Sequence, residues 1–194
     1  MLADDIQKGF PNGVQLPQDL RRLCEFAEAN EGTISGCFEF ETEGHSAAQA
    51  WFGDDTRAAS QFAVFGRGPD GSLYALWLHA GNDTGKAPVV LLDSECSDNK
   101  IIADNVRAFL RLLAIGYEEP GRFPTLEPED PEGADALRTW LFDELGVGVP
   151  GEWNRIGRRS STATSGPGRL DSHMAGAAVT ATSLRVTKSG LMNI

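Results

Sequence analysis

The sequence predicts an α+β domain over residues 1–153 and a separate tail over residues 154–194. Two apolar segments flanking a turn-forming cluster predict a β-hairpin, and three further segments have the apolar periodicity of helices. Charge and aromatic content then change together at Trp153. The residues up to Trp153 hold 11 basic and 27 acidic side chains, a net charge of −16, and all 16 aromatic residues, whereas the last 41 residues hold 6 basic and 1 acidic.

The hairpin is the clearest local prediction. The apolar segments 61–65 and 72–79 flank residues 66–71, GRGPDG, which are rich in turn formers. Both alternating sets of side chains in the second segment are apolar, so this strand is expected at the centre of its sheet. Residues 89–92 predict a third antiparallel strand, and the alternation of Phe and Glu over 38–41 predicts a half-buried strand whose acidic side is solvated.

Three helices are expected because apolar side chains recur every three or four residues in three segments. Prolines and glycines set their limits, and the four prolines of segment 118–132 predict an acidic connecting loop before the third helix. The expected helices run from Pro17 to about Asn30, from Ile102 to about Gly116, and from Asp130-Pro131 to Gly146.

The tail is expected to be disordered. Ser, Thr, Gly and Ala make up 21 of its 41 residues, which leaves too few large apolar groups to offset the entropy of ordering. The abrupt change leaves a second hypothesis open, that the tail is an out-of-frame continuation of a domain that normally ends differently. The coding DNA decides this, because a single-base slip after Ile156 would then restore a helix-like sequence.

Composition excludes several functional classes. No apolar run approaches the ~20 residues of a membrane span, and the N-terminus has neither the basic nor the apolar region of a signal peptide, so a cytoplasmic protein is expected. The cysteines, Cys24, Cys37 and Cys96, lack CxxC spacing and are expected to be reduced and buried. The acidic charge disfavours direct binding to nucleic acid and favours a basic protein partner.

No catalytic constellation stands out. His45, His79 and His173 have no second ligand at zinc-binding spacing, and Cys96 with His79 as its base lacks any recognised local signature. The glycines of residues 66–71 lie between two strands, which is the wrong context for a phosphate-binding loop. The acidic clusters do not follow the EF-hand pattern. The protein is therefore expected not to be an enzyme and to need no metal or cofactor.

The acidic clusters have two interpretations. Most such side chains are solvated surface, but an acidic sheet face can also imitate a polyanion and steer a basic partner into contact. Trp51 likewise has two interpretations. It fits a core position, but it also lies beside Phe52 in a stretch rich in glycine and acidic residues, where it could be partly exposed to a partner.

Five motifs in order resemble the SUKH superfamily, the cell-wall-assembly-regulator type of domain found widely among bacterial toxin immunity proteins. They cover about residues 16 to 146, although the family usually has glycine where this chain has Asp93 and Cys96, so the turn after the third strand is expected to differ. The matching segments are LPxxL (16–20) with NEG (30–32), FAVFG (62–66), DGSLYALW (70–77), PVVLLDSE (88–95), and NVxxFLxLLAxG (105–116).

The resemblance implies a twisted antiparallel sheet with helices packed around it, and a cytoplasmic immunity protein that neutralises a cognate toxin, frequently a nuclease. The expected mechanism is occlusion of a basic cleft by acidic side chains that stand in for phosphates. A general protein-interaction or scaffold module with a regulatory role is the alternative. The residues expected to contact the partner are Glu39, Glu41, Trp51, Asp54 and Asp55.

Overall fold

A computed structural model describes most of residues 1–148 and three short strands near the C-terminus. The described ranges are 1–53, 55–79, 83–95, 99–122, 127–130, 132–148, 182–183, 185–186 and 192–193. The prediction of a disordered tail over 154–194 falls outside them, apart from those three strands. Among the helices of the described ranges, none has the length and hydropathy of a membrane span.

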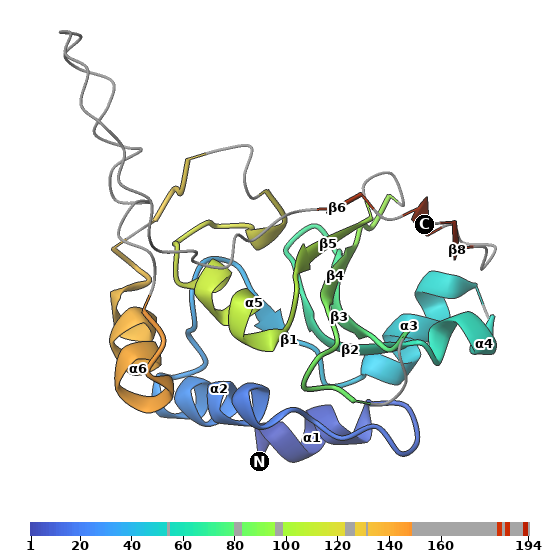
Figure 1. The fold of residues 1–194 in the computed structure, drawn as a ribbon, viewed down its shortest axis with the longest axis horizontal. Helices are drawn as coiled ribbons and strands as arrows, with labels where there is room; N and C mark the ends of the chain where they lie inside the picture. The colour runs from blue at the N-terminus through green and yellow to red at the C-terminus, as the bar shows by residue number, and fades with distance from the viewer. Residues whose placement is uncertain are drawn as a thin grey trace, which may run out of the picture.

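An antiparallel sheet flanked by helices confirms the α+β class (Figure 1). Its strands pair in chain order, so each strand lies beside the next. The strands are β1 (Glu39–Phe40), β2 (Phe62–Arg67), β3 (Leu73–Trp77), β4 (Val89–Leu92) and β5 (Lys100–Ala103), with β6 (Thr182–Ser183) beside β5, and with β7 (Arg185–Val186) paired to β8 (Met192–Asn193). The helices are α1 (Leu2–Lys8), α2 (Gln18–Ala29), α3 (Gly44–Phe52), α4 (Thr56–Ala59), α5 (Val106–Leu113), the 3-10 turn η1 (Pro120–Arg122) and α6 (Asp135–Leu145).

The sheet is covered on both faces. Side chains alternate along β3, so that Tyr74 and Leu76 join a core built with α1, α2, α5 and α6, while Leu73, Ala75 and Trp77 join a second core built with α3 and α4. Figure 1 shows these two helical layers on opposite sides of the strands. All five β3 residues are buried, which confirms the prediction of a central strand with two apolar faces.

Phe38 organises the larger core. Its ring lies 5.4 to 5.6 Å from the rings of Phe40, Tyr74 and Phe109, at the offset and edge-on angles that aromatic pairs prefer. The ring passes over Gly66 of β2, where any Cβ would collide with it. A glycine at this position therefore lets the β1 side of the sheet and α5 share one aromatic cluster.

The second predicted helix begins later than its apolar spacing suggests. Ile102 is buried in β5, and α5 starts only at Val106, because the Asn105 side chain caps the helix by accepting a hydrogen bond of 3.0 Å from the Ala108 N–H. Only two residues separate β5 from α5, so Ile102 of the strand and Val106 of the helix stand four residues apart. This spacing is also that of an apolar stripe on one helix. The predicted start of the third helix at Asp130-Pro131 is also early, since α6 begins at Asp135.

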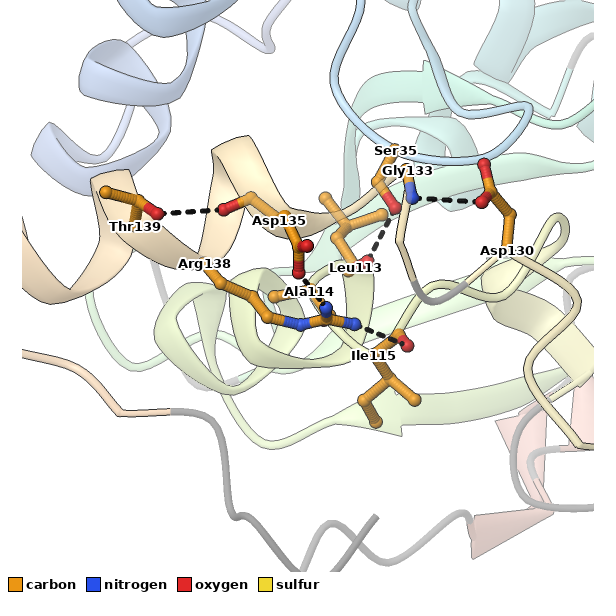
Figure 2. A network of polar contacts seen from close by, with 9 residues as sticks. All are labelled: Ser35, Leu113, Ala114, Ile115, Asp130, Gly133, Asp135, Arg138 and Thr139. Atoms are coloured by element: carbon orange, nitrogen blue, oxygen red, sulfur yellow. Dashed lines mark hydrogen bonds and ion pairs between the residues drawn. The ribbon is translucent and has the colours of Figure 1, made fainter. Parts of the chain in front are cut away.

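The end of α5 is held by α6. The Arg138 guanidinium donates to the carbonyls of Ala114 (2.7 Å) and Ile115 (3.1 Å), and the Ser35 hydroxyl donates to that of Leu113 (2.7 Å) (Figure 2). Asp135, one turn before Arg138 on α6, pairs with the same guanidinium at 2.5 Å. A cation thus satisfies two carbonyls of buried residues at the negative end of α5 and fixes α6 against it.

The two described cysteines differ in burial. Cys24 is buried in α2 as expected, and burial raises the pKa of its thiol to about 12. Cys37 is exposed, so the prediction of burial is wrong there: it lies in the loop before β1, where its backbone N–H donates to the Glu118 carbonyl at 2.8 Å. Cys96 lies outside the described residues.

Replacing Arg138 by Met should lower the free energy of unfolding by about 1–3 kcal/mol, because the carbonyls at the end of α5 lose a charged donor. Urea denaturation followed by circular dichroism measures the change. The matched control Arg57→Met removes an exposed arginine of α4 whose guanidinium makes no hydrogen bond or ion pair with the described residues, and it should shift stability by no more than about 0.5 kcal/mol. Equal losses of stability in the two variants would contradict a stabilising role of the Arg138 hydrogen bonds at the end of α5.

Candidate partner-binding surface

A small hollow of about 100 Å³ lies at one end of the sheet, where the β2–β3 turn, the end of β4 and the start of β5 meet. The segment that follows Tyr117 closes its remaining side. Three carboxylates line the hollow against one ammonium group, so this end of the sheet has an acidic character. Its polar lining comprises Asp70, Ser72, Tyr74, Asp93, Lys100 and Glu119.

The β2–β3 turn fixes the first of these carboxylates. Gly71 takes a φ of +86°, and the Asp70 carboxylate accepts hydrogen bonds from the Ser72 N–H (3.0 Å) and the Ser72 hydroxyl (2.7 Å). The Ser72 oxygen in turn accepts from the N–H of Ser94 at 3.2 Å. The turn is therefore tied to the segment that leaves β4, and Asp70 is held in place before any partner arrives.

Asp93 is positioned from both directions along its backbone. Its N–H donates to the side-chain oxygen of the buried Asn99 at 2.8 Å, and its carbonyl accepts from the indole N–H of Trp51 at 3.2 Å. Trp51 belongs to α3, in the smaller helical layer. The helix layer and the end of β4 thus meet at the hollow.

Tyr74 links the hollow to the core. Its ring is buried in the aromatic cluster, and burial raises the pKa of its hydroxyl well above the ordinary value. A hydrogen bond with the Gly121 backbone opposes this rise, whereas Asp70 and Glu119 add to it. Asp70 and Glu119 line the same hollow as Tyr74, at one end of β3.

Further carboxylates lie on the segments that follow α5. The Glu118 N–H donates to a carboxylate oxygen of Glu129 at 3.1 Å, which folds the segment 127–130 back against the one after α5. Burial raises the pKa of the Tyr117 hydroxyl, and Glu129 and Glu127 raise it further. We refer to the connected set as the acidic rim; it consists of Asp70, Asp93, Glu118, Glu119, Glu127 and Glu129.

The predicted acidic strand face does not form as expected. Glu39 is exposed, but Glu41 is buried, with its carboxylate paired to the Arg67 guanidinium through Nε at 2.9 Å and also through Nη2. The other carboxylate oxygen accepts from the Glu43 N–H at 2.8 Å. Because β1 ends at Phe40, the alternation does not continue to residue 41, and the prediction of a solvated Glu41 is wrong.

The other predicted contact residues are spread over the smaller helical layer. Trp51 is a core residue, only 7% exposed, and it acts on the rim through its bond to Asp93. Asp55 caps α4 by accepting from the N–H groups of Arg57 and Ala58, and Asp54 lies outside the described residues. The four of these residues that the structure describes, Glu39, Glu41, Trp51 and Asp55, are therefore not gathered into one surface.

The sequence does not predict the residues of the acidic rim as a binding surface. Asp70 lies in a predicted turn and segment 118–132 in a predicted connecting loop, because both patterns are typical of irregular structure. The density of carboxylates in that loop was the available signal. Their proximity to the hairpin turn depends on how the chain folds back after α5, which no local pattern encodes.

The described residues do not bring Cys96 and His79 together as a nucleophile and its base, since only His79 is described. His79 is exposed and stacks on Trp77, with ring centroids 4.4 Å apart, and Cys96 lies outside the described ranges. Within those ranges, no group of three or more His, Cys, Asp or Glu side chains is arranged to hold a metal ion.

Comparison of the chain with protein-family models, with curated proteins and with solved structures gave no match.

The chain has two tyrosines, and both should ionise late in the folded protein. Burial first, and nearby carboxylates second, raise the pKa of Tyr74 and of Tyr117 above the unfolded value of about 10. Because the folded state holds these protons more tightly, the stability they contribute is complete below pH ~10 and is lost as the pH rises further.

Phenolate absorbance measures this, with the chain in denaturant as reference, and the single variants Tyr74→Phe and Tyr117→Phe assign the two steps. A folded protein whose tyrosines titrate together with the denatured chain would contradict the burial of both hydroxyls.

Proposed function

We propose that this protein is a SUKH-type immunity protein of the cytoplasm, which binds a basic toxin domain and neutralises it by occlusion with the acidic rim. The observation that carries the proposal is the gathering of Asp70, Asp93 and Glu119 around one hollow at the end of the sheet, with Glu118, Glu127 and Glu129 on the segments that follow α5. A hydrogen bond from the Glu118 N–H to the Glu129 carboxylate holds these segments together. The motifs that resemble the superfamily support the same assignment.

The rim suits a polycation better than a single ion. Its carboxylates are distributed over the β2–β3 turn, the end of β4 and segment 118–129, so they present a broad negative potential. A basic cleft of the kind that binds a nucleic-acid backbone would be attracted from a distance and then covered. Asp70 and Asp93 are fixed by their own turns, which reduces the ordering cost on binding.

Of the residues predicted from the sequence, Glu39 stays in the proposed interface. It is exposed on β1, and the backbone two residues earlier is bonded to Glu118 of the rim. Trp51 contributes indirectly, as the residue that holds the Asp93 carbonyl. Glu41 and Asp55 have structural roles, the first beside Arg67 and the second at the start of α4.

Growth rescue tests the proposal. The full chain is co-expressed with each toxin-like domain encoded beside its gene, and complexes are recovered by pull-down at low and at high salt. Rescue of growth with a salt-sensitive complex supports neutralisation by an acidic surface. A complex that forms without any rescue favours the scaffold alternative, and a salt-insensitive complex places the interface on apolar residues instead.

Neutralising three rim residues should weaken the complex on the order of tenfold at low salt, and high salt should remove most of that difference. The variant carries Asp70→Asn, Glu119→Gln and Glu129→Gln, in which the amide oxygens of residues 70 and 129 can still accept from the Ser72 N–H and the Glu118 N–H. Isothermal titration against the recovered toxin domain measures the change.

The matched control changes the net charge equally on exposed residues outside the rim. It carries Glu25→Gln, Glu31→Gln and Asp143→Asn. If both triple variants lose the same affinity, overall charge rather than the acidic rim would determine binding.

A further inference from the structure

The two sides of the six-stranded sheet are protected unequally. β1 forms one edge and comprises only Glu39–Phe40. On the other side β5 comprises Lys100–Ala103, whose single charge is that of Lys100, and β6 lies beyond it. A short, charged edge strand resists pairing with other chains, whereas a longer apolar one favours it. β5 is therefore the strand whose outer edge most needs a cover.

β6 covers part of that edge. It pairs antiparallel with β5, with Ser183 opposite Lys100 and Thr182 opposite Ile101 (Figure 1). An antiparallel strand therefore fits beside the first half of β5. Two residue pairs supply few hydrogen bonds, so β6 can leave while the rest of the sheet stays folded. The uncovered strand would then present a row of unpaired N–H and C=O groups.

The sequence of β5 is complementary to itself in one antiparallel register. A two-fold axis perpendicular to the sheet can place Ile102 of one copy opposite Ile102 of a second copy. Equivalent faces of the two sheets then lie on the same side, because residues directly opposite each other in a strand pair point to the same face. In this register Lys100 of each copy lies opposite Asp104 of the other.

Charge favours this register. Asp104 is the exposed residue that directly follows β5, and Lys100 is partly exposed at the start of the strand. Opposite charges directly across an antiparallel pair stabilise it, and like charges destabilise it. Because the axis is two-fold, the favourable pair forms twice. A second copy of the chain is therefore a partner of matching charge for this edge.

We propose that β6 is a removable edge strand that keeps the protein monomeric, and that its release lets a second copy of the chain pair through β5 in this register. The two sheets then continue into each other across the dimer. Strands of four residues bury little area, so the association should be weak and should depend on protein concentration. The inference concerns the sheet edge and does not rest on the proposed function.

The double variant Thr182→Pro, Ser183→Pro tests the cover in the full chain. Proline has no N–H and cannot donate to the ladder, so β6 should detach from β5. At low protein concentration, amide hydrogen exchange in residues 100–103 should then be about threefold faster or more. The control, Arg185→Pro with Val186→Pro, breaks the pairing of β7 with β8 instead and should leave that exchange unchanged.

Sedimentation velocity at physiological salt, where repulsion between the acidic copies is screened, measures the association. As concentration rises, the apparent mass of the Thr182→Pro, Ser183→Pro variant should approach about twice that of the monomer, and residues 100–103 should regain protection from exchange. The unmodified chain and the control should stay monomeric. Unchanged exchange at low concentration would overturn β6 as a cover. A detached β6 without any dimer, or a dimer that leaves residues 100–103 unprotected, would overturn pairing through β5.

Charge reversal tests the register in the same proline background. Lys100→Glu places like charges opposite each other and should weaken the dimer on the order of tenfold, whereas Lys100→Glu combined with Asp104→Lys restores opposite charges and should recover most of the affinity. Loss without recovery in the combined variant would overturn this register, because a general disturbance of β5 is not repaired by a second substitution.

Discussion

The fold depends on one constraint, that the central strand β3 is apolar on both of its faces. Leu73, Ala75 and Trp77 need one helical layer and Tyr74 and Leu76 need another, since neither set can be left in water. Both broad faces of the sheet are thereby used for packing. The polar groups that remain available are at the ends of the strands and along the sheet edges, and the acidic rim lies at such an end.

The core and the candidate surface are therefore parts of one construction. Tyr74 belongs to both, because its ring packs against Phe38 and Phe109 while the residue also lines the hollow. Trp51 does the same from the opposite layer, with its ring in the smaller core and its indole N–H on the Asp93 carbonyl. Recognition at this end would rest on side chains whose supports are buried, which keeps the geometry of the surface constant.

The sequence alone predicts the elements whose signals are local. The hairpin, β4, α2 and much of α5 carry an apolar period and turn residues that agree with each other, and the two-faced pattern of β3 already requires a layer on each side. The elements α1 and α4 are too short for an apolar stripe to become distinct, and α3, which is no shorter than α5, carries three alanines and so shows little contrast between its faces. β5 is hidden because its residues continue the period of α5.

The candidate surface is harder to predict for a related reason. The alternation of Phe and Glu over 38–41 follows the strand rule, but whether a carboxylate meets water or the Arg67 guanidinium depends on where pairing with β2 stops. The rim likewise joins residues almost sixty positions apart, from Asp70 to Glu129. Charge density indicates that such a surface exists, and only the path of the chain after α5 locates it.

The contact of Arg138 of α6 with the end of α5 also bears on the order in which the two cores can close during synthesis. The smaller core needs no described residue beyond Ile101, whereas the larger one includes Leu137 and Leu141 of α6. The carbonyls of Ala114 and Ile115 also gain their hydrogen bonds from Arg138 only once α6 has been synthesised. A nascent chain can thus complete one side of the sheet while the other still exposes apolar side chains. Among the described helices α6 is the last to emerge from the ribosome, and its Leu137 and Leu141 complete the larger core.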